Sequence, residues 1–208
     1  MSLKGFLLSV IITLLPLLAS AQSFSLLDKF YKGVSDSCLE MTYSYSTRLS
    51  GIDNNGKGDL CLQGLMWKAK GNGVEMYSDS KSVWIVDPEM KEVVIEPAAD
   101  EESSQWVSNP AVIFARLYDI FVVNESLPSQ DGKSVMYVLK PKSKSDIDYC
   151  NIELYKSDAM VRRATVALVG GTLIKIEVSS MKLTPKVSDE TFLPQSKFDA
   201  SWIVTDLR

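Results

Sequence analysis

The sequence predicts a single-domain α+β protein, with one antiparallel sheet of about eleven strands and two helices packed on one side. Most of the chain alternates apolar and polar side chains with a period of two, and turn-forming residues separate these segments at short intervals. Only two segments show helical periodicity. A sheet with so many strands and short hairpins curls into a barrel or near-barrel, so the two helices must close its open side.

The first helix is predicted from about residue 26. Its apolar residues fall on one stripe at the 3.6-residue period: Leu26, Leu27, Phe30, Tyr31 and Val34. This stripe predicts a helix that packs against the sheet through one face.

From residue 38 the period changes to two, because Leu39, Met41 and Tyr43 alternate with polar residues. The sequence Asp-Asn-Asn-Gly at 53–56 is typical of a turn. The return strand, 58–69, carries apolar residues in both phases, which predicts that it is covered on both sides.

The remaining strands are bounded by turn signals such as Gly71-Asn72-Gly73 and Asp87-Pro88-Glu89. The strands are predicted at 74–77, 82–86, 92–96, 121–127, 133–140, 148–155, 160–169, 172–183 and 202–204.

The second helix is predicted to begin at Asn109-Pro110, with proline in the first helical position, and to end near Asp119. Its apolar surface is too wide for an ordinary amphipathic stripe. The mature chain is also rich in methionine and tryptophan, and methionine suits cavities for variable apolar ligands. Such residues also fill ordinary cores. A wide apolar helix over a curved sheet favours an interior with room for a ligand.

Residues 1–21 have the pattern of a cleavable signal peptide. Lys4 precedes an apolar run over 5–18, and Ala19-Ser20-Ala21 supplies the small residues of a cleavage site. The run is shorter than the roughly 20 apolar residues of a membrane span. We therefore expect the domain 22–208 to be free in the periplasm.

Composition excludes several functional classes. The chain is 46% hydrophobic and 23% charged, which is typical of a globular protein, and its formal net charge of −4 argues against nucleic-acid binding. It contains no histidine, which removes Ser-His-Asp and Cys-His catalysis and most zinc sites. The carboxylates at 100–102, 146 and 148 show no recognisable glycosidase arrangement. We expect no catalytic residues, metal or cofactor.

The three cysteines, Cys38, Cys61 and Cys150, lack metal-ligand spacing and allow one internal disulfide at most. With the turn at 53–56, Cys61 is expected opposite Arg48, far along the strand from Cys38. That register predicts three separate small side chains.

Several segments, in their order along the chain, resemble the LolA-like outer-membrane lipoprotein carriers, including the shorter-tailed carriers of Bacteroides-like bacteria. The resemblance spans roughly 26–208. The matching segments are Gly58-Asp59-Leu60, the stretch 78–84 leading to Asp87-Pro88, 109–113, Asp189-Glu190-Thr191-Phe192, and 200–208.

The resemblance implies an open eleven-stranded half-barrel with a helical lid over an apolar cavity. It implies a carrier that takes the acyl chains of lipoproteins from an inner-membrane transporter and passes them to an outer-membrane receptor. The family's lid-latching arginine would fall at Gly64, which has no side chain for that role.

We therefore expect a monomeric, non-catalytic carrier of acylated lipoproteins. Alternative hypotheses are a carrier of another amphiphile, such as a glycolipid or fatty acid, a module whose groove binds a protein segment, and an unfamiliar carboxylate enzyme. The predicted acyl-chain cavity is lined by Met41, Tyr43, Leu60, Leu62, Trp84, Val112, Ile113, Phe114 and Leu117.

Overall fold

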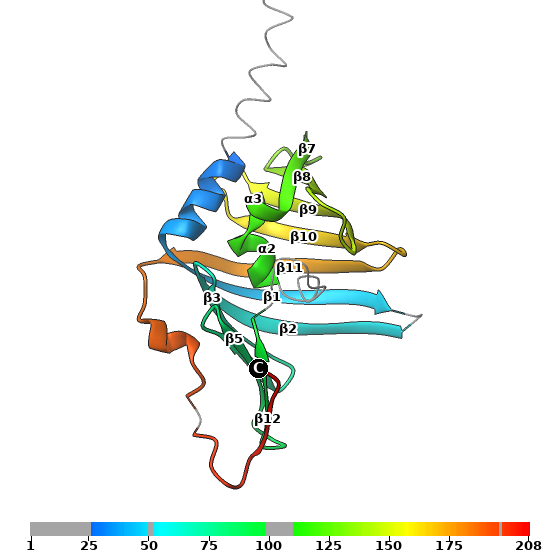
Figure 1. Ribbon diagram of the computed structural model, residues 1–208. Helices are drawn as coiled ribbons and strands as arrows, with labels where there is room; N and C mark the ends of the chain where they lie inside the picture. Colours follow the sequence, from blue (N-terminus) through cyan, green and yellow to red (C-terminus); the bar gives the residue numbers. More distant parts are fainter. Residues whose placement is uncertain (1–25, 50–51, 99–109, 196) are drawn as a thin grey trace, which may run out of the picture.

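The computed structural model describes residues 26–49, 52–98, 110–195 and 197–208 (Figure 1). These residues form one open 12-stranded sheet with short helical segments against its concave face, in agreement with the predicted curved sheet. The predicted signal peptide and the carboxylates at 100–102 lie outside the described residues.

The strands follow one another as hairpins with short connections. Their order in the sheet is β12-β6-β5-β4-β3-β2-β1-β11-β10-β9-β8-β7. Their bounds are β1 Cys38–Leu49, β2 Ile52–Gln63, β3 Met66–Gly71, β4 Val74–Ser78, β5 Ser82–Asp87, β6 Glu92–Pro97, β7 Phe121–Pro128, β8 Ser134–Pro141, β9 Ile147–Tyr155, β10 Val161–Leu168, β11 Leu173–Thr184 and β12 Ile203–Asp206.

The hairpin of β1 and β2 differs from the predicted one. The strands pair up to Leu49↔Ile52, so the turn lies at 50–51 and the segment 53–56 belongs to β2. The predicted return strand 58–69 is divided by a second turn at Gly64, which separates β2 from β3 and raises the strand count from eleven to twelve. This shift in register also overturns the predicted separation of Cys38 and Cys61.

Directly paired residues share a face, so the register identifies the two faces of the sheet. One row across β1 to β5 is largely apolar and faces the helices: Met41, Leu60, Ala69, Met76 and Ile85. The neighbouring row lies on the outer face: Glu40, Cys61, Lys68, Tyr77 and Trp84. A register shift at Thr42/Tyr43, between β1 and β11, is of the kind that bends a sheet.

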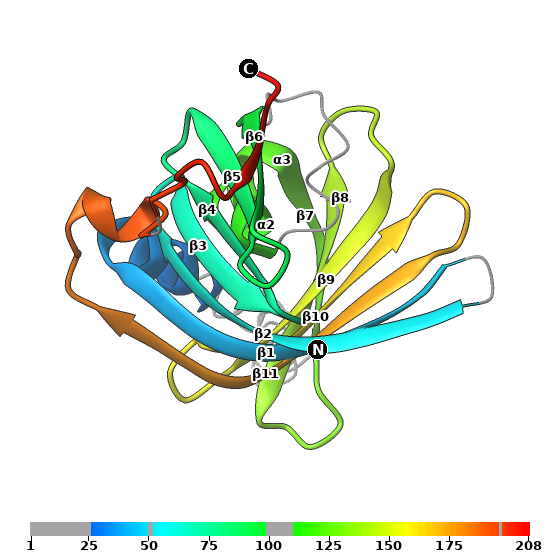
Figure 2. The same ribbon diagram turned by 90° about the horizontal axis from the view of Figure 1, so that it is seen from below.

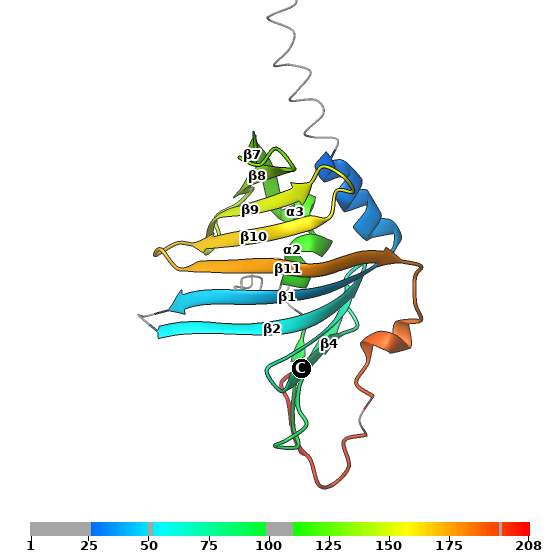
Figure 3. The same cartoon turned by 180° about the vertical axis from the view of Figure 1, so that it is seen from behind.

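Helices cover the concave face, as the sequence predicted. The N-terminal helix spans 26–36, and the second predicted helix is broken into α2, Pro110–Ala115, and α3, Leu117–Ile120. Pro110 is the first residue of α2, as expected. Seen from below, the sheet curves around α2 and α3 (Figure 2). From behind, the strands lie in front of these segments, which places the helices on one face (Figure 3).

The C-terminal segment crosses to the outer face. It contains the 3₁₀ helix η2, Asp189–Phe192, and ends in β12, which pairs parallel with β6 rather than antiparallel. Gln63 holds the beginning of this segment through two hydrogen bonds to the Val187 backbone, of 2.8 and 3.1 Å. The aromatic side chains of Phe198 and Trp202 pack on Val86 and its neighbours on β5 and β6.

Candidate functional site

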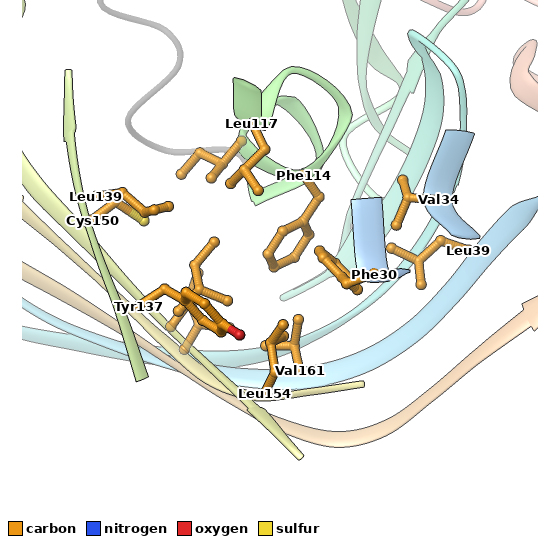
Figure 4. Packing of buried hydrophobic residues seen from close by; sticks show 14 of the residues in the cluster. Phe30, Val34, Leu39, Phe114, Leu117, Tyr137, Leu139, Cys150, Leu154 and Val161 are labelled. Carbon is orange, nitrogen blue, oxygen red and sulfur yellow. The ribbon is translucent and has the colours of Figure 1, made fainter. Parts of the chain in front are cut away.

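The concave face and the helices over it form one continuous apolar cluster. Strand side chains from both halves of the sheet point toward the helices, as seen for Tyr137 and Leu154 in Figure 4. Phe114 points from α2 into this cluster and meets Phe30 of the N-terminal helix edge to face, with ring centroids 5.7 Å apart. The two helical segments therefore contact each other as well as the sheet.

Six of the nine predicted cavity residues belong to this cluster, and each is at most 3% exposed. In this structure they are packed against other protein side chains. A ligand can therefore reach them only if the helical segments move away from the sheet. These six residues are Met41, Leu60, Leu62, Ile113, Phe114 and Leu117.

The other three predicted residues are placed differently. Tyr43 is partly buried on the concave face, where its ring approaches Gly58 so closely that a Cβ there would lie 2.9 Å from the Tyr43 hydroxyl oxygen. Val112 is partly buried. Trp84 lies on the outer face, packed with Val86 and Ile95, because its register pairs it with Tyr77. We therefore exclude Trp84 from the cavity wall.

Part of the concave face is incompletely covered. Partly buried side chains continue the apolar cluster along the strands: Tyr43, Tyr45, Ala69, Met76, Ile85, Ile174 and Val178. The Tyr45 hydroxyl accepts a hydrogen bond of 2.6 Å from the Asn72 side chain at the turn between β3 and β4. This strip forms an apolar approach to the buried cluster.

The N-terminal helix contributes residues absent from the predicted site. Leu27, Phe30 and Val34 are at most 2% exposed and fill the concave face beside α2. Their 3.6-residue stripe predicted a packed face, but periodicity does not say which surface a helix will cover. The docking of this helix over the sheet is a tertiary feature.

Few polar contacts join the helical segments. The Tyr118 hydroxyl in α3 donates a 2.6 Å hydrogen bond to the Asp28 carboxylate in the N-terminal helix, and its ring packs against Tyr31 with centroids 4.8 Å apart. Burial and the Asp28 hydrogen bond raise the pKa of Tyr118 above its usual value. Tyr137, fully buried on β8, forms a hydrogen bond with the Leu27 backbone.

Gly64 does not lie where a side chain could hold the helices. It forms the turn between β2 and β3 with a φ of +61°, which favours glycine, and a Cβ there would meet nothing within 4 Å. The tie between Tyr118 and Asp28 joins the helical segments instead.

The site shows packing chemistry rather than acid–base or metal chemistry. Among the described residues, no group of three Cys, Asp or Glu side chains could hold a metal ion. No helix in the same part of the chain is long and apolar enough to cross a membrane.

Comparison with known proteins supports the fold. An uncharacterized conserved protein from Thermus thermophilus superposes with a TM-score of 0.53 at 13% identity, covering 88% of this chain and 98% of that one. The LolA superfamily protein NE2245 from Nitrosomonas europaea is 12% identical and covers 82% of this chain and 96% of its own, with a TM-score of 0.46. Among curated protein sequences, none matches significantly.

The family evidence comes from the sequence. The family described as "Outer membrane lipoprotein carrier protein LolA" matches residues 66–195, from the start of β3 to beyond η2. This match covers more than half of the chain. The chain therefore belongs to the LolA family of outer membrane lipoprotein carrier proteins.

Proposed function

We propose that this protein is a non-catalytic periplasmic carrier that shields the acyl chains of lipoproteins between the inner and outer membranes. One observation carries the proposal. The concave apolar face is covered by two helical segments that pack on it mainly through apolar side chains such as Phe30 and Phe114. An acyl chain can replace these side chains on the sheet when the segments move.

Such replacement keeps binding reversible. Burying a sixteen-carbon chain contributes on the order of 12 kcal/mol, at about 0.8 kcal/mol per methylene. The helical segments must give up their own apolar contacts, including those of Phe114 and Leu117, when cargo enters. The net affinity is the difference between two similar burials, so cargo can be released to a receptor without an enzymatic step.

The polar ties suit this role because they are few. The hydrogen bond between Tyr118 and Asp28 joins the two helical segments, so breaking it separates them without leaving an unpaired group in the core. Asp28 is exposed, and water can replace the lost contact. An inner-membrane transporter and an outer-membrane receptor are the proposed partners, each favouring a different position of the helices.

A second candidate function keeps the site and changes the cargo. Gly64 provides no arginine at the position expected for the family's latch, so the opening mechanism and the ligand can both differ. A free fatty acid or a glycolipid offers the same apolar chain to the concave face.

Native mass spectrometry of the protein purified from the periplasm tests the proposal. Organic extraction of the bound material should release acylated peptide in near-stoichiometric amount. Recovery of glycolipid or fatty acid alone would favour the second candidate. A lipid-free protein that also fails to bind added acyl peptide would contradict both and would favour a protein-binding groove. The Trp84→Ala variant, altered on the outer face, serves as a matched control that should retain its lipid.

A further inference from the structure

Two of the three cysteines meet on the outer face of the sheet. Cys38 begins β1, Cys61 lies on β2, and their Sγ atoms are 2.9 Å apart. Glu40 pairs with Cys61, so Cys38 and Cys61 are diagonal neighbours on the same face of adjacent strands. All three cysteines are free thiols in this structure.

The C-terminal segment covers this pair. Phe192 of η2 is fully buried against the sulfurs, with Met66 and Val187 beside it. The two hydrogen bonds between Gln63 and Val187 hold the segment in place next to them. The thiols therefore lie in a preformed apolar site that holds them together.

We propose that Cys38 and Cys61 form an intramolecular disulfide under oxidising conditions. A disulfide needs its sulfurs about 2.05 Å apart, so the two atoms must approach by less than 1 Å. Adjacent strands already supply the correct face and neighbourhood. The bond would join the residue that follows the N-terminal helix to the second strand of the sheet.

The reaction is a thiol–disulfide exchange with a disulfide oxidant, such as oxidised glutathione or a thiol–disulfide oxidoreductase. The Cys61 thiolate attacks one oxidant sulfur and forms a mixed disulfide, releasing the other oxidant sulfur as a thiolate that takes up a proton. The Cys38 thiolate then attacks Cys61 Sγ and releases the rest of the oxidant as a thiol. Two protein thiols lose two electrons and two protons, and the oxidant disulfide gains them.

Access favours Cys61 as the first sulfur to react. Cys61 lines an open groove of about 700 Å³ on the outer face, together with Lys68 and Thr191, whereas Cys38 is fully buried. Burial and the neighbouring Cys38 raise the pKa of Cys61 to about 12, so little thiolate forms while the segment is docked. Oxidation is therefore faster when the C-terminal segment lifts.

The third cysteine takes no part in the bond. Cys150 is fully buried in the cluster on the concave face, on the opposite side of the sheet from Cys38 and Cys61. It remains a single thiol. The proposed disulfide does not depend on the carrier function, because it rests only on the outer face.

The test counts thiols in the full chain. Reduced protein is equilibrated with oxidised glutathione, quenched in acid, unfolded and treated with N-ethylmaleimide, and its intact mass and peptides are measured. We expect one maleimide adduct, at Cys150, a mass loss of two hydrogens before labelling, and a linked peptide pair containing Cys38 and Cys61. Three adducts, mixed disulfides with glutathione at either residue, or a link to Cys150 would overturn the proposal.

Two variants sharpen the result. Cys150→Ser retains the pair and should give no adduct after oxidation, while two adducts would contradict the proposal. Phe192→Ala removes the side chain that covers the sulfurs and should oxidise several-fold faster than the parent protein in native buffer. An unchanged or slower rate would contradict the predicted role of the C-terminal segment as a cover.

Discussion

Replacing Tyr118 with phenylalanine tests how the helical segments are held over the concave face. Tyr118→Phe deletes the hydroxyl that donates to Asp28 and keeps the ring that packs on Tyr31. The apolar packing of α3 is therefore preserved. Any effect on ligand binding then reports the hydrogen bond between the two segments.

The magnitude follows from the geometry. A hydrogen bond to a charged acceptor contributes about 1.5–3 kcal/mol when it is protected from solvent. Asp28 is exposed, so water can satisfy its carboxylate after the change, and we expect a loss of about 1 kcal/mol. That loss corresponds to about a fivefold shift toward the open arrangement of the helices.

The consequence is tighter apparent binding. If a ligand binds only when the helices are open, its apparent affinity is the intrinsic affinity reduced by the open fraction. Tyr118→Phe should therefore tighten the apparent dissociation constant of a dansylated fatty acid by about fivefold, measured by fluorescence titration. Faster hydrogen exchange in 26–36 should accompany it.

The matched control is Tyr31→Phe. The Tyr31 ring contacts Tyr118, and its hydroxyl has no hydrogen-bond partner among the described residues. This variant should bind the probe like the parent protein. Weaker or unchanged binding by Tyr118→Phe, with the fold intact by circular dichroism, would refute the reasoning that this contact restrains the lid.

Three further outcomes are expected. Phe114→Asp should leave the sheet folded by circular dichroism but abolish fatty-acid binding, whereas Trp84→Ala on the outer face should bind normally; global unfolding by Phe114→Asp would show that α2 is simply core. Burial raises the pKa of Tyr137 to about 12. Its contribution is thus complete below pH 10 and is lost as the pH rises from 10 to 12, lowering the free energy of unfolding by up to about 3 kcal/mol, and Tyr137→Phe should remove this alkaline loss in urea titrations. Gln63→Ala deletes two hydrogen bonds to Val187 and should cost about 2 kcal/mol in the same titrations, while no change would mean that the C-terminal segment is held elsewhere.

Local patterns predicted much of the fold. Gly71-Asn72-Gly73 lies at the predicted turn because Asn72 and Gly73 both adopt positive φ, with values of 52° and 82°. Pro110 begins α2 because its missing N–H costs nothing in the first turn of a helix. In both cases a few neighbouring residues contain the whole cause, so no distant contact was needed.

The prediction failed where long-range pairing outweighed a local preference. The segment 53–56 has turn-forming residues, yet it lies in β2 because continuous pairing with β1 extends past it. An error of this kind changes every facing residue, and it separated Cys38 from Cys61 on paper. It also merged β2 with β3 across Gly64.

Candidate site residues were predicted in proportion to how far side-chain alternation determines their environment. Met41, Leu60 and Leu62 share a face of the sheet because alternation places them there, and all three lie in the concave cluster. Trp84 follows the same local pattern, but its pairing with Tyr77 places it on the outer face. Only the register across several strands could distinguish these cases.

The sequence by itself determined which segments are strands and helices, and which faces of them are apolar, because these properties arise within a few residues. The tertiary structure alone decided that the N-terminal helix covers the concave face, that Tyr118 reaches Asp28, and that Cys38 meets Cys61 beneath Phe192. These contacts join residues far apart along the chain. Their formation depends on strand register and on the curvature of the whole sheet, which no local pattern specifies.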